Sequence, residues 1–284
     1  MLRVNLHLHS TCSDGTCPPP ELVRLLSLHG VAVASLTDHD TAEGVPAFLA
    51  ACRKRGIRGV AGVELSSYLE TPTGGPGPDE LHILGYRFDL KDPALNAAFA
   101  HCVEGRRRRN EAICHKLTAL GFPVSLEEVE ARAGDGVTGR PHIAQVLLDK
   151  GYVPTRRDAF ARYLGEGGAA YVPRELPSSE EVIRLILEAG GLPVWAHPLN
   201  SLSDPDGFED VLDRLGNAGL WGVECWFHGS TPAQTLRCLM AAGRRGLYAT
   251  AGTDFHGRAG HSAKIAGRVV PDDVLPWARF CGGR

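Results

Sequence analysis

Short apolar runs alternate with helical patterns through the first and last thirds of the chain, and this order constrains the fold more than any other feature. Six runs are predicted as strands: residues 4–9, 32–37, 60–64, 192–196, 222–226 and 247–251. Helices are predicted near or between them, at residues 18–30, 43–55, 180–189, 207–218 and 231–244. Such alternation is typical of parallel strands joined by crossover helices. The sequence therefore predicts an α/β fold.

The middle of the chain has a different pattern. Between residues 98 and 174 helical periodicity dominates and charged residues are denser, which predicts an α-helical insertion. The α/β fold would then be built from two parts, residues 1–97 and 175–284. The segment Thr71–Pro78 is rich in glycine and proline and is predicted as a flexible loop.

One helix of the insertion has an unusual face. The helix predicted over residues 103–120 carries its apolar stripe on Ile113, Leu117 and Leu120. The same stripe continues toward the amino end through Arg109 and Arg106. A face that is apolar at one end and cationic at the other suits a helix that packs on a core and reaches over a polar site. The run Arg106–Arg109 is equally compatible with a solvated charge run.

Histidine and carboxylate residues gather at or just beyond the predicted strands, and one more, His82, follows the glycine-rich loop. Nine of them are of metal-ligand type: His7, His9, Asp14, His39, Glu64, His82, His197, Asp254 and His256. In parallel sheets and barrels the carboxyl ends of the strands meet on one face, so we expect these side chains to converge. A single histidine after a strand is more often an ordinary polar residue. Nine residues of this kind predict a metal cluster.

The residue types also narrow the metal and the chemistry. Imidazole and carboxylate groups without thiolates favour manganese, iron, zinc or cobalt over magnesium. At three to four protein ligands per ion, nine residues would hold two or three divalent ions. We expect manganese, with iron or zinc as alternatives. Paired ions suit the hydrolysis of phosphate esters or amides.

Composition excludes several classes of protein. The net charge is −3, which argues against a strongly basic nucleic-acid coat. No run of about 18 apolar residues predicts a membrane span, and the first residues lack a signal-peptide core, so a cytoplasmic protein is expected. The eight cysteines contain no Cys-x-x-Cys pair, which argues against a zinc ribbon. No feature identifies a protein partner.

The strand-end residues lie in motifs that resemble a known family. These motifs are His7-x-His9, Asp14, Thr37–Asp40, Gly62–Glu64, His82, Ala196–Pro198 and Thr253–Gly257. Together they are similar to the polymerase-and-histidinol-phosphatase (PHP) superfamily, in order and over almost the whole chain. The resemblance implies a distorted seven-stranded (β/α) barrel that holds a trinuclear centre of divalent metals.

The resemblance also implies three groups of ligands. The first ion would be held by His7, His9, Glu64 and Asp254, and the second by Asp14, His39 and His256. The third ion would be held by His82 and His197, with Glu64 bridging to the first. All nine positions are filled in this chain.

Motifs in the insertion narrow the resemblance to a subfamily. Gly139–Ala144, Tyr163–Gly165 and Ala170–Pro173 are similar to PHP enzymes that act on nucleoside 3′,5′-bisphosphates and to related 5′→3′ exoribonucleases. In those enzymes a helical insertion caps the barrel and holds a second phosphate. The residues that match this role are Arg106, Arg109, Arg140 and His142. Guanidinium groups suit phosphate, although His142 is also compatible with a helix cap.

One position departs from the subfamily. Its members often carry Gly-Arg-Tyr after the His-Pro pair, whereas this chain has Leu199–Ser201 after Pro198. A cation near the third metal would therefore have to come from another residue. Arg174 and Arg258 are the candidates, unless the preferred substrate differs.

We therefore expect a metal-dependent phosphoesterase in which a metal-bridging hydroxide attacks phosphorus in line. Asp254 and His256 would be ligands that can also carry a proton. His228 would contact substrate or act as general acid, unless it is an ordinary loop histidine. The expected substrate is a nucleoside 3′,5′-bisphosphate, which would lose its 3′-phosphate, or a short oligoribonucleotide cut from its 5′ end. Neither a long nucleic acid nor a membrane is required.

Three alternatives use the same residues differently. A histidinol-phosphate phosphatase would share the metal cluster without needing paired arginines. An amide hydrolase is a second alternative, although no lysine lies at an evident strand end. The third is a non-catalytic PHP accessory module, which lost ligands or a fused partner domain would favour.

Overall fold

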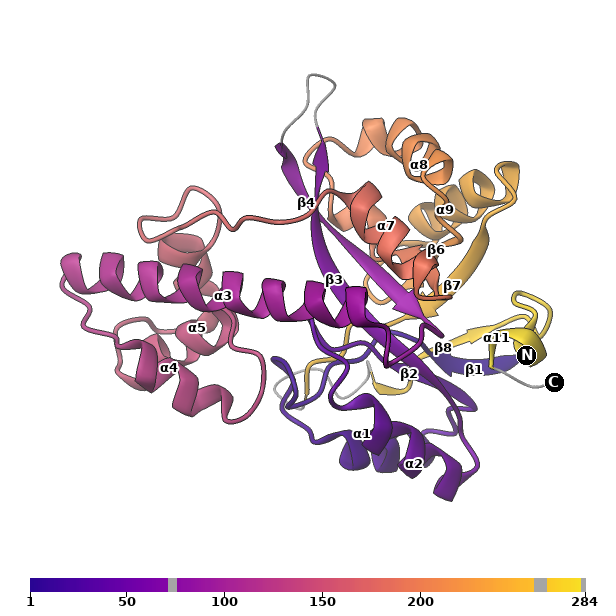
Figure 1. Ribbon diagram of the computed structural model, residues 1–284, viewed down its shortest axis with the longest axis horizontal. Helices are drawn as coiled ribbons and strands as arrows, with labels where there is room; N and C mark the ends of the chain where they lie inside the picture. The colour runs from indigo at the N-terminus through magenta and orange to yellow at the C-terminus, as the bar shows by residue number, and fades with distance from the viewer. Residues whose placement is uncertain (71–75, 258–264, 282–284) are drawn as a thin grey trace.

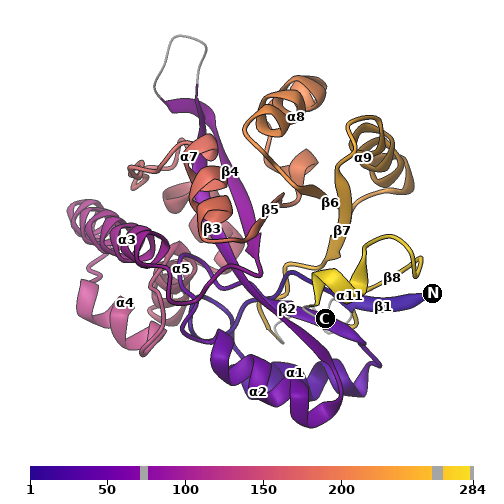
Figure 2. The same cartoon turned by 45° about the vertical axis from the view of Figure 1, so that its right-hand side comes forward.

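A computed structural model describes residues 1–70, 76–257 and 265–281. The eight strands in these ranges form one sheet in the order β7-β6-β5-β4-β3-β2-β1-β8, curled into a nearly closed barrel (Figures 1 and 2). Their bounds are β1 Leu2–Asn5, β2 Val33–Leu36, β3 Arg58–Glu70, β4 Pro76–Tyr86, β5 Leu192–Trp195, β6 Gly222–Phe227, β7 Tyr248–Gly252 and β8 Arg268–Val270. The Leu6 N–H donates to the Ala251 carbonyl across the seam, at 3.0 Å. The α/β barrel class is confirmed, with one strand more than the resemblance implies.

Helices cover the outside of the barrel. They are α1 Pro19–Leu28, α2 Val45–Arg55, α7 Ser179–Glu188, α8 Phe208–Asn217 and α9 Pro232–Arg244, with short 3-10 turns at Pro198–Asn200 and Pro205–Gly207. A further helix, α11 Trp277–Phe280, instead packs its aromatic side chains with strand residues such as Val4 and Leu84. The apolar faces of the outer helices supply the core: Leu22 and Leu26 of α1, for example, are fully buried. Burial of each such leucine stabilises the fold by roughly 1.5–3 kcal/mol. Among the described residues, no helix is long and apolar enough to cross a membrane.

Two strands run against the predicted parallel pattern. β4 pairs antiparallel with both β3 and β5, and β8 pairs antiparallel with β1. The predicted flexible loop Thr71–Pro78 is wrong for residues 76–78, which begin β4; residues 71–75 lie outside the described part of the chain. Glycine and proline concealed the start of this strand, because both are uncommon in strand interiors. The consequence is local: β4 places His82 opposite Ser66, two residues beyond Glu64 on β3.

The helical middle of the chain builds a second hydrophobic cluster. α3 spans Pro93–Ala119, ten residues earlier than predicted at its start, because the Asp92 carboxylate accepts the Leu95 N–H and caps the helix. It is followed by α4 Leu126–Ala133, α5 Arg140–Asp149, α6 Arg156–Ala159 and a π-helical turn at Phe160–Leu164. These elements pack on the second half of α3 and form a lobe beside the barrel (Figure 1).

The predicted stripe on α3 holds for most of its length. Ile113 and Leu117 are fully buried in the cluster of the lobe, and Arg109 and Arg106 continue the buried face toward the barrel with only 5% and 8% of their surface exposed. Leu120 was predicted on this face, but it lies just after the end of the helix and is 45% exposed. The alternative of a solvated charge run holds for Arg107 and Arg108, whose side chains are exposed.

Candidate metal centre

The candidate ligands enter the barrel mouth where strand pairing ends. β1 stops at Asn5, and the extended segment beyond it carries His7 and His9, joined to the loop after β7 by a bridge between Leu8 and Phe255. Each of these two histidine side chains is fully buried. Alternate residues of an extended segment point to the same side, which is why both imidazoles face inward.

Glu64 lies at the centre of the nine residues. It is fully buried inside β3, and its two carboxylate oxygens face five imidazoles. The distances are 3.3 Å to His7 Nε2, 3.1 Å to His9 Nε2, 3.2 Å to His39 Nδ1, 2.8 Å to His82 Nδ1 and 3.2 Å to His197 Nε2. We call these residues, with Asp14, Asp254 and His256, the metal cluster.

The potential ligand atoms fall into three groups. The first consists of His7, His9, Glu64 and Asp254, as the resemblance implies. The second consists of Asp14, His39 and His256 together with His9, whose ring stacks on His256 at 4.0 Å between centroids. The third consists of His39, Glu64 and His82, and His197 reaches it through Glu64. The structure thus brings all nine predicted residues together and shares His9 and His39 between groups.

Unpaired buried atoms show that these residues fit a metal. Five atoms of the metal cluster are buried and, although other ligand atoms lie 3.0–3.8 Å away, make no contact with hydrogen-bond geometry within the described ranges: His7 Nε2, His9 Nδ1, His9 Nε2, His39 Nδ1 and Glu64 Oε2. Buried polar groups are normally paired, because an unpaired one costs free energy. Several ligand-type atoms that face one another satisfy this requirement when they bind a cation.

The ionisable groups of the metal cluster have very different pKa values. Burial lowers the pKa of His39 to about 3. Burial also acts to lower the pKa of His82, but Glu64 and Glu80 outweigh it and raise that pKa to about 10. The pKa of Glu64 itself lies well below its usual value, because His7, His39 and His82 outweigh its burial. Neighbouring imidazoles whose pKa values differ this much do not all become protonated over the same pH range.

Backbone strain is concentrated beside the metal cluster. Of the described non-glycine residues, four have a positive φ, and three of them adjoin or belong to the cluster: Asp40 at 56°, His197 at 31° and Asp254 at 53°. Such conformations cost of order 1–3 kcal/mol each and persist only where surrounding contacts hold them. The chain therefore bends at these points to aim side chains into the barrel mouth.

Asp38 holds the loop that carries Asp14. Its Oδ1 accepts the Ser10 backbone N–H at 2.7 Å and the Ser13 hydroxyl at 2.6 Å, and its Oδ2 accepts the Ser10 hydroxyl at 2.6 Å. These three bonds fix the turn just before Asp14, which then lies 3.2 Å from His256 Nε2. Asp38 precedes His39 in the motif Thr37–Asp40. The sequence alone did not indicate that it supports the loop of a ligand.

A cluster of arginines lies next to the metal cluster. Arg106 Nε is 2.5 Å from Asp40 Oδ2, and Arg174 donates to the same oxygen at 3.0 Å. Glu80 lies 3.8 Å from Arg174 and 3.7 Å from Arg140. Arg109 completes the group, which we call the arginine cluster: Arg106, Arg109, Arg140 and Arg174. Asp40 and Glu80 were not predicted, since a carboxylate in a loop has no signature until its neighbours are known.

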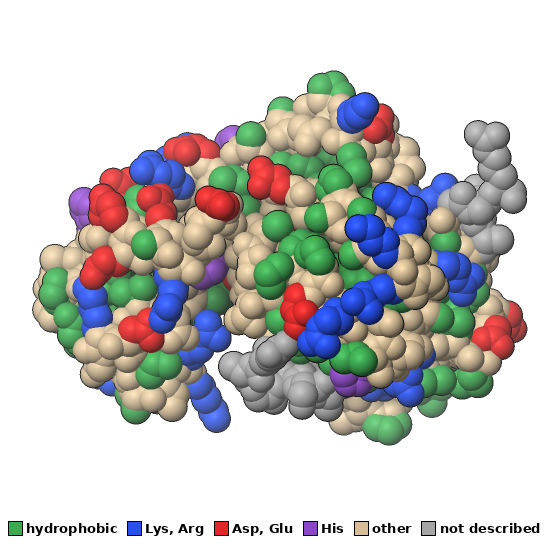
Figure 3. Space-filling view, turned by 90° about the horizontal axis from the view of Figure 1, so that it is seen from below, with side chains coloured by type: hydrophobic (Ala, Val, Ile, Leu, Met, Phe, Trp, Pro, Cys, Tyr) green, Lys and Arg blue, Asp and Glu red, His purple; other side chains and the backbone are tan. Residues whose placement is uncertain are grey.

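The arginine cluster has more donors than acceptors. Arg109 Nε and Arg174 Nε and Nη2 are buried without a hydrogen-bond partner in the described structure. Burial, with Arg106 and Arg140 nearby, lowers the pKa of Arg109 to about 9. A cavity of about 220 Å³ opens beside Arg108, Arg109 and Arg174. On the face seen in Figure 3, a furrow separates the helical lobe from the barrel, and Lys and Arg side chains lie along its lobe side.

The remaining predicted residues have varied positions. His142 caps α5, where its Nδ1 accepts the Gly139 N–H at 3.0 Å. His228 lies in the turn directly after β6 and is half-buried. Two arginines were candidates for the cation near the third metal. The side chain of Arg174 is buried, with only 2% of its surface exposed, and Arg258 lies outside the described residues.

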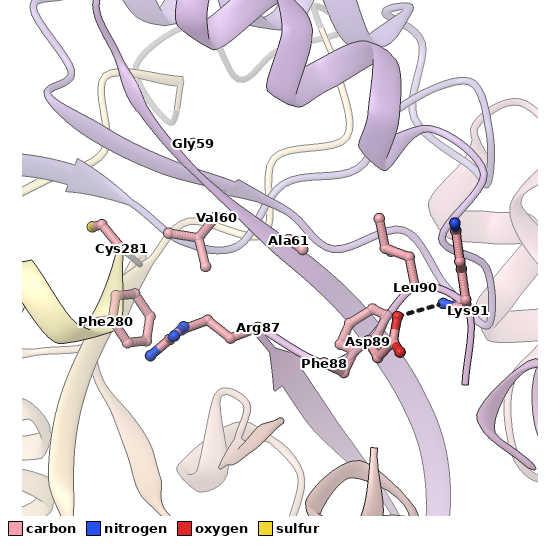
Figure 4. Close-up of a pocket in the computed structure, with 10 residues that line it drawn as sticks. All are labelled: Gly59, Val60, Ala61, Arg87, Phe88, Asp89, Leu90, Lys91, Phe280 and Cys281. Atoms are coloured by element: carbon pink, nitrogen blue, oxygen red, sulfur yellow. Dashed lines mark hydrogen bonds between the residues drawn. The ribbon is translucent and has the colours of Figure 1, made fainter. Parts of the chain in front are cut away.

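A separate cavity of about 400 Å³ lies at the other end of the barrel strands (Figure 4). It is lined by Gly59–Ala61 at the start of β3, Arg87–Lys91 after β4, and Phe280 and Cys281. None of the nine metal-cluster residues lines it. In barrels of this type, chemistry takes place at the opposite, carboxyl end of the strands.

Comparison with known proteins identifies the family. Residues 5–124 match the family described as PHP domain. The chain is also 33% identical to a 5′-3′ exoribonuclease from Haemophilus influenzae, over 98% of this chain and 99% of that protein. This chain belongs to the PHP family. A second relative, a 3′,5′-nucleoside bisphosphate phosphatase from Chromobacterium violaceum, is 32% identical to this PHP protein over 98% of this chain and 95% of that protein.

A solved structure has a similar fold. An amidohydrolase from Chromobacterium violaceum, determined with sulfate and without metal, superposes with a TM-score of 0.87 at 30% identity, over 99% of this chain and 96% of that one. The predicted PHP resemblance and the enzyme class, a phosphoric-ester hydrolase, are therefore confirmed.

Proposed function

We propose that this PHP enzyme hydrolyses phosphate esters of nucleotides. The proposed substrates are nucleoside 3′,5′-bisphosphates, which lose the 3′-phosphate, and short oligoribonucleotides that are shortened from the 5′ end. One observation carries the proposal: unpaired buried ligand atoms for cations and unpaired buried guanidinium donors for an anion occur side by side. Two relatives that span nearly the whole chain have names that describe these two substrates.

The metal cluster would bind the reacting phosphate through its ions. His7, His9, Glu64 and Asp254 would hold one ion, Asp14, His39 and His256 a second, and His82 and His197 with Glu64 a third. Manganese is the expected metal, and iron or zinc are alternatives. Bound ions would lower the pKa of water and stabilise charge on the phosphate oxygens. The chain would keep these ligands in place through the strained backbone at His197 and Asp254.

The arginine cluster would bind the second phosphate. Four guanidinium groups face two carboxylates, Asp40 and Glu80, which leaves an excess of about two positive charges. A phosphate monoester carries −1.5 to −2 charges at neutral pH and accepts bidentate hydrogen bonds from arginine. Arg109 and Arg174 would make the principal contacts, because they carry the unpaired donors. A second phosphate held at a fixed place would orient the reacting one.

The predicted roles of Arg106 and His142 change in this proposal. Arg106 donates its Nε to Asp40 and so would hold the cluster together rather than bind phosphate first. His142 uses Nδ1 to cap α5, which would place the amino end of that helix and Arg140 near the site. Residues 98–174 would then act as a cap over the barrel mouth. His228 is retained as the proposed general acid, with Asp254 or His256 able to carry a proton.

The test measures the products that the manganese-loaded protein releases: inorganic phosphate from the phosphate monoesters and 5′-nucleotides from the RNA. Adenosine 3′,5′-bisphosphate, AMP, histidinol phosphate and a short 5′-phosphorylated RNA are compared at equal concentration. The proposal expects kcat/KM for the bisphosphate or the RNA to exceed that for histidinol phosphate. A preference for histidinol phosphate would overturn the substrate class and retain the metal centre. No turnover of any substrate, with metal bound, would favour an accessory role or amide hydrolysis.

A further inference from the structure

Glu224 is a buried carboxylate on β6 that does not belong to the three ligand groups. Only 1% of its surface is exposed. Its two oxygens lie 3.2 and 3.3 Å from His7 Nδ1, and Oε2 also accepts the backbone N–H of His197 at 2.9 Å. One carboxylate thus contacts the side chain of one candidate ligand and the backbone of another. Sequence reasoning did not select it, because it lies within a strand rather than after one.

The contact with His7 determines how that imidazole is used. Nδ1 faces Glu224, while Nε2 faces Glu64 and Asp254 at 3.3 and 3.4 Å. A proton on Nδ1 that is donated to a carboxylate leaves the Nε2 lone pair directed at the metal position. Metal-bound histidines commonly donate their other ring N–H to such an outer carboxylate, which fixes the tautomer and the ring orientation.

The contact with His197 acts on the backbone. His197 has φ 31° and ψ 52°, a conformation that non-glycine residues rarely adopt. Its N–H is tied to Glu224, and its Nε2 points to Glu64 Oε1 at 3.2 Å. The rings of His7 and His197 stack at 5.6 Å between centroids. Glu224 therefore contacts two residues whose stacked imidazoles both face Glu64.

Gly252 on β7 makes room for this arrangement. A Cβ atom at this position would lie 2.3 Å from Glu224 Oε1 and 2.4 Å from His7 Cβ, closer than real Cβ contacts. The glycine is thus required by the approach of Glu224 to His7. A residue with any side chain at this point would push the pair apart.

From these contacts we infer that Glu224 is a positioning residue: it sets the Nδ1–H tautomer of His7 and holds the backbone of His197, so that one carboxylate prepares the first and third ligand groups together. The inference rests on the proposed metal centre. It predicts that loss of the carboxylate weakens metal binding while the chain remains folded. Loss of such outer partners typically lowers metal affinity about 10–100-fold.

The test compares Glu224→Gln with the unmodified protein and with Glu188→Gln, an exposed control on α7. Mn²⁺ affinity and stoichiometry are measured by titration of the metal-free proteins, and folding by circular dichroism. Glu224→Gln is expected to lose about 10–100-fold in affinity for at least one ion, and Glu188→Gln is expected to behave like the unmodified protein. Unchanged affinity and stoichiometry in folded Glu224→Gln would overturn the inference.

A second measurement needs no variant. In the unmodified protein loaded with diamagnetic Zn²⁺, nitrogen NMR of labelled histidines reports which ring nitrogen of His7 carries the proton. A slowly exchanging proton on Nδ1 is expected, and metal on Nδ1 with the proton on Nε2 would overturn the inference. If the unmodified protein binds no metal at all, the proposed metal centre fails instead, so the two failures are distinguishable.

Discussion

The metal cluster and the arginine cluster are both buried and both contain unpaired polar atoms, but the atoms are of opposite kinds. Around Glu64 the unpaired atoms are ligand atoms of imidazole and carboxylate groups, whereas around Arg109 they are guanidinium donors. One region therefore needs a cation and the other an anion. The proposed substrate, a metal-bound phosphate ester with a second phosphate, would meet both needs, whereas a substrate with a single phosphate would not.

The largest expected effect on the metal cluster comes from Glu64→Gln. The variant keeps the shape of the side chain but removes the charge that faces five imidazoles. We expect metal to be lost and kcat for every phosphate ester to fall by about 10³-fold or more, because the ions supply most of the electrostatic stabilisation. Metal content and phosphate release measure the effect. Full activity of a folded variant would contradict the metal-centre interpretation.

The metal cluster should also give the metal-free protein a distinctive pH dependence. The pKa values of His82 and His256 are raised to about 10, because nearby carboxylates outweigh burial. A raised pKa stabilises the folded state below the unfolded value near 6.5, and this contribution disappears as pH rises through 10. We therefore expect the free energy of unfolding of the metal-free protein to decrease between about pH 6.5 and pH 10, as measured by urea denaturation.

Metal should reverse this loss. Ions bind neutral imidazoles, so Mn²⁺ at about 100 times its dissociation constant is expected to stabilise the protein by roughly 2.7 kcal/mol at pH 8. The control is the same titration of Glu64→Gln, in which the stabilisation should be absent. Equal responses in the two proteins would show that Mn²⁺ acts elsewhere.

The arginine cluster is tested by comparing the variant Arg109→Ala with the control variant Arg107→Ala. The two positions are two residues apart on α3, but Arg109 is buried with an unpaired Nε and the Arg107 side chain is 55% exposed beside Glu130. Loss of a charged hydrogen bond of about 2 kcal/mol would raise KM for a bisphosphate roughly 30-fold in Arg109→Ala. KM for an aryl phosphate should stay constant. Equal changes for both substrates would argue against a second-phosphate site.

The smallest expected effect concerns the helical lobe. The Ser125 hydroxyl accepts the Glu128 N–H, and the Glu128 carboxylate accepts the Ser125 N–H, so the two residues form a capping box on α4. Ser125→Ala is expected to cost about 1 kcal/mol of stability and to leave kcat unchanged. Thermal unfolding and phosphate release measure the two quantities. A marked loss of kcat would show that the lobe transmits its stability to the metal centre.

The sequence selected the nine residues of the metal cluster and the four arginines, but not the two carboxylates, Asp40 and Glu80, that join those arginines. The nine residues of the metal cluster could be selected because a ligand after each of several strands has one common destination. The arginine cluster depends on contacts between distant segments: Arg174 and Glu80 meet Asp40 and Arg140 only after β4 has paired with β3 and β5. No periodicity reports such contacts, and the glycines and prolines before His82 hid the strand that creates them.

Because His39 and Asp40 are adjacent in the sequence, they constrain how the site can change during evolution. His39 belongs to the metal cluster, and its neighbour Asp40 binds two members of the arginine cluster. Consecutive Cα atoms are about 3.8 Å apart, so a single inserted or deleted residue in this loop would displace both groups together. If the arginine cluster binds substrate as proposed, substitutions of the arginines can change substrate preference, whereas the loop that joins the two groups must keep its length.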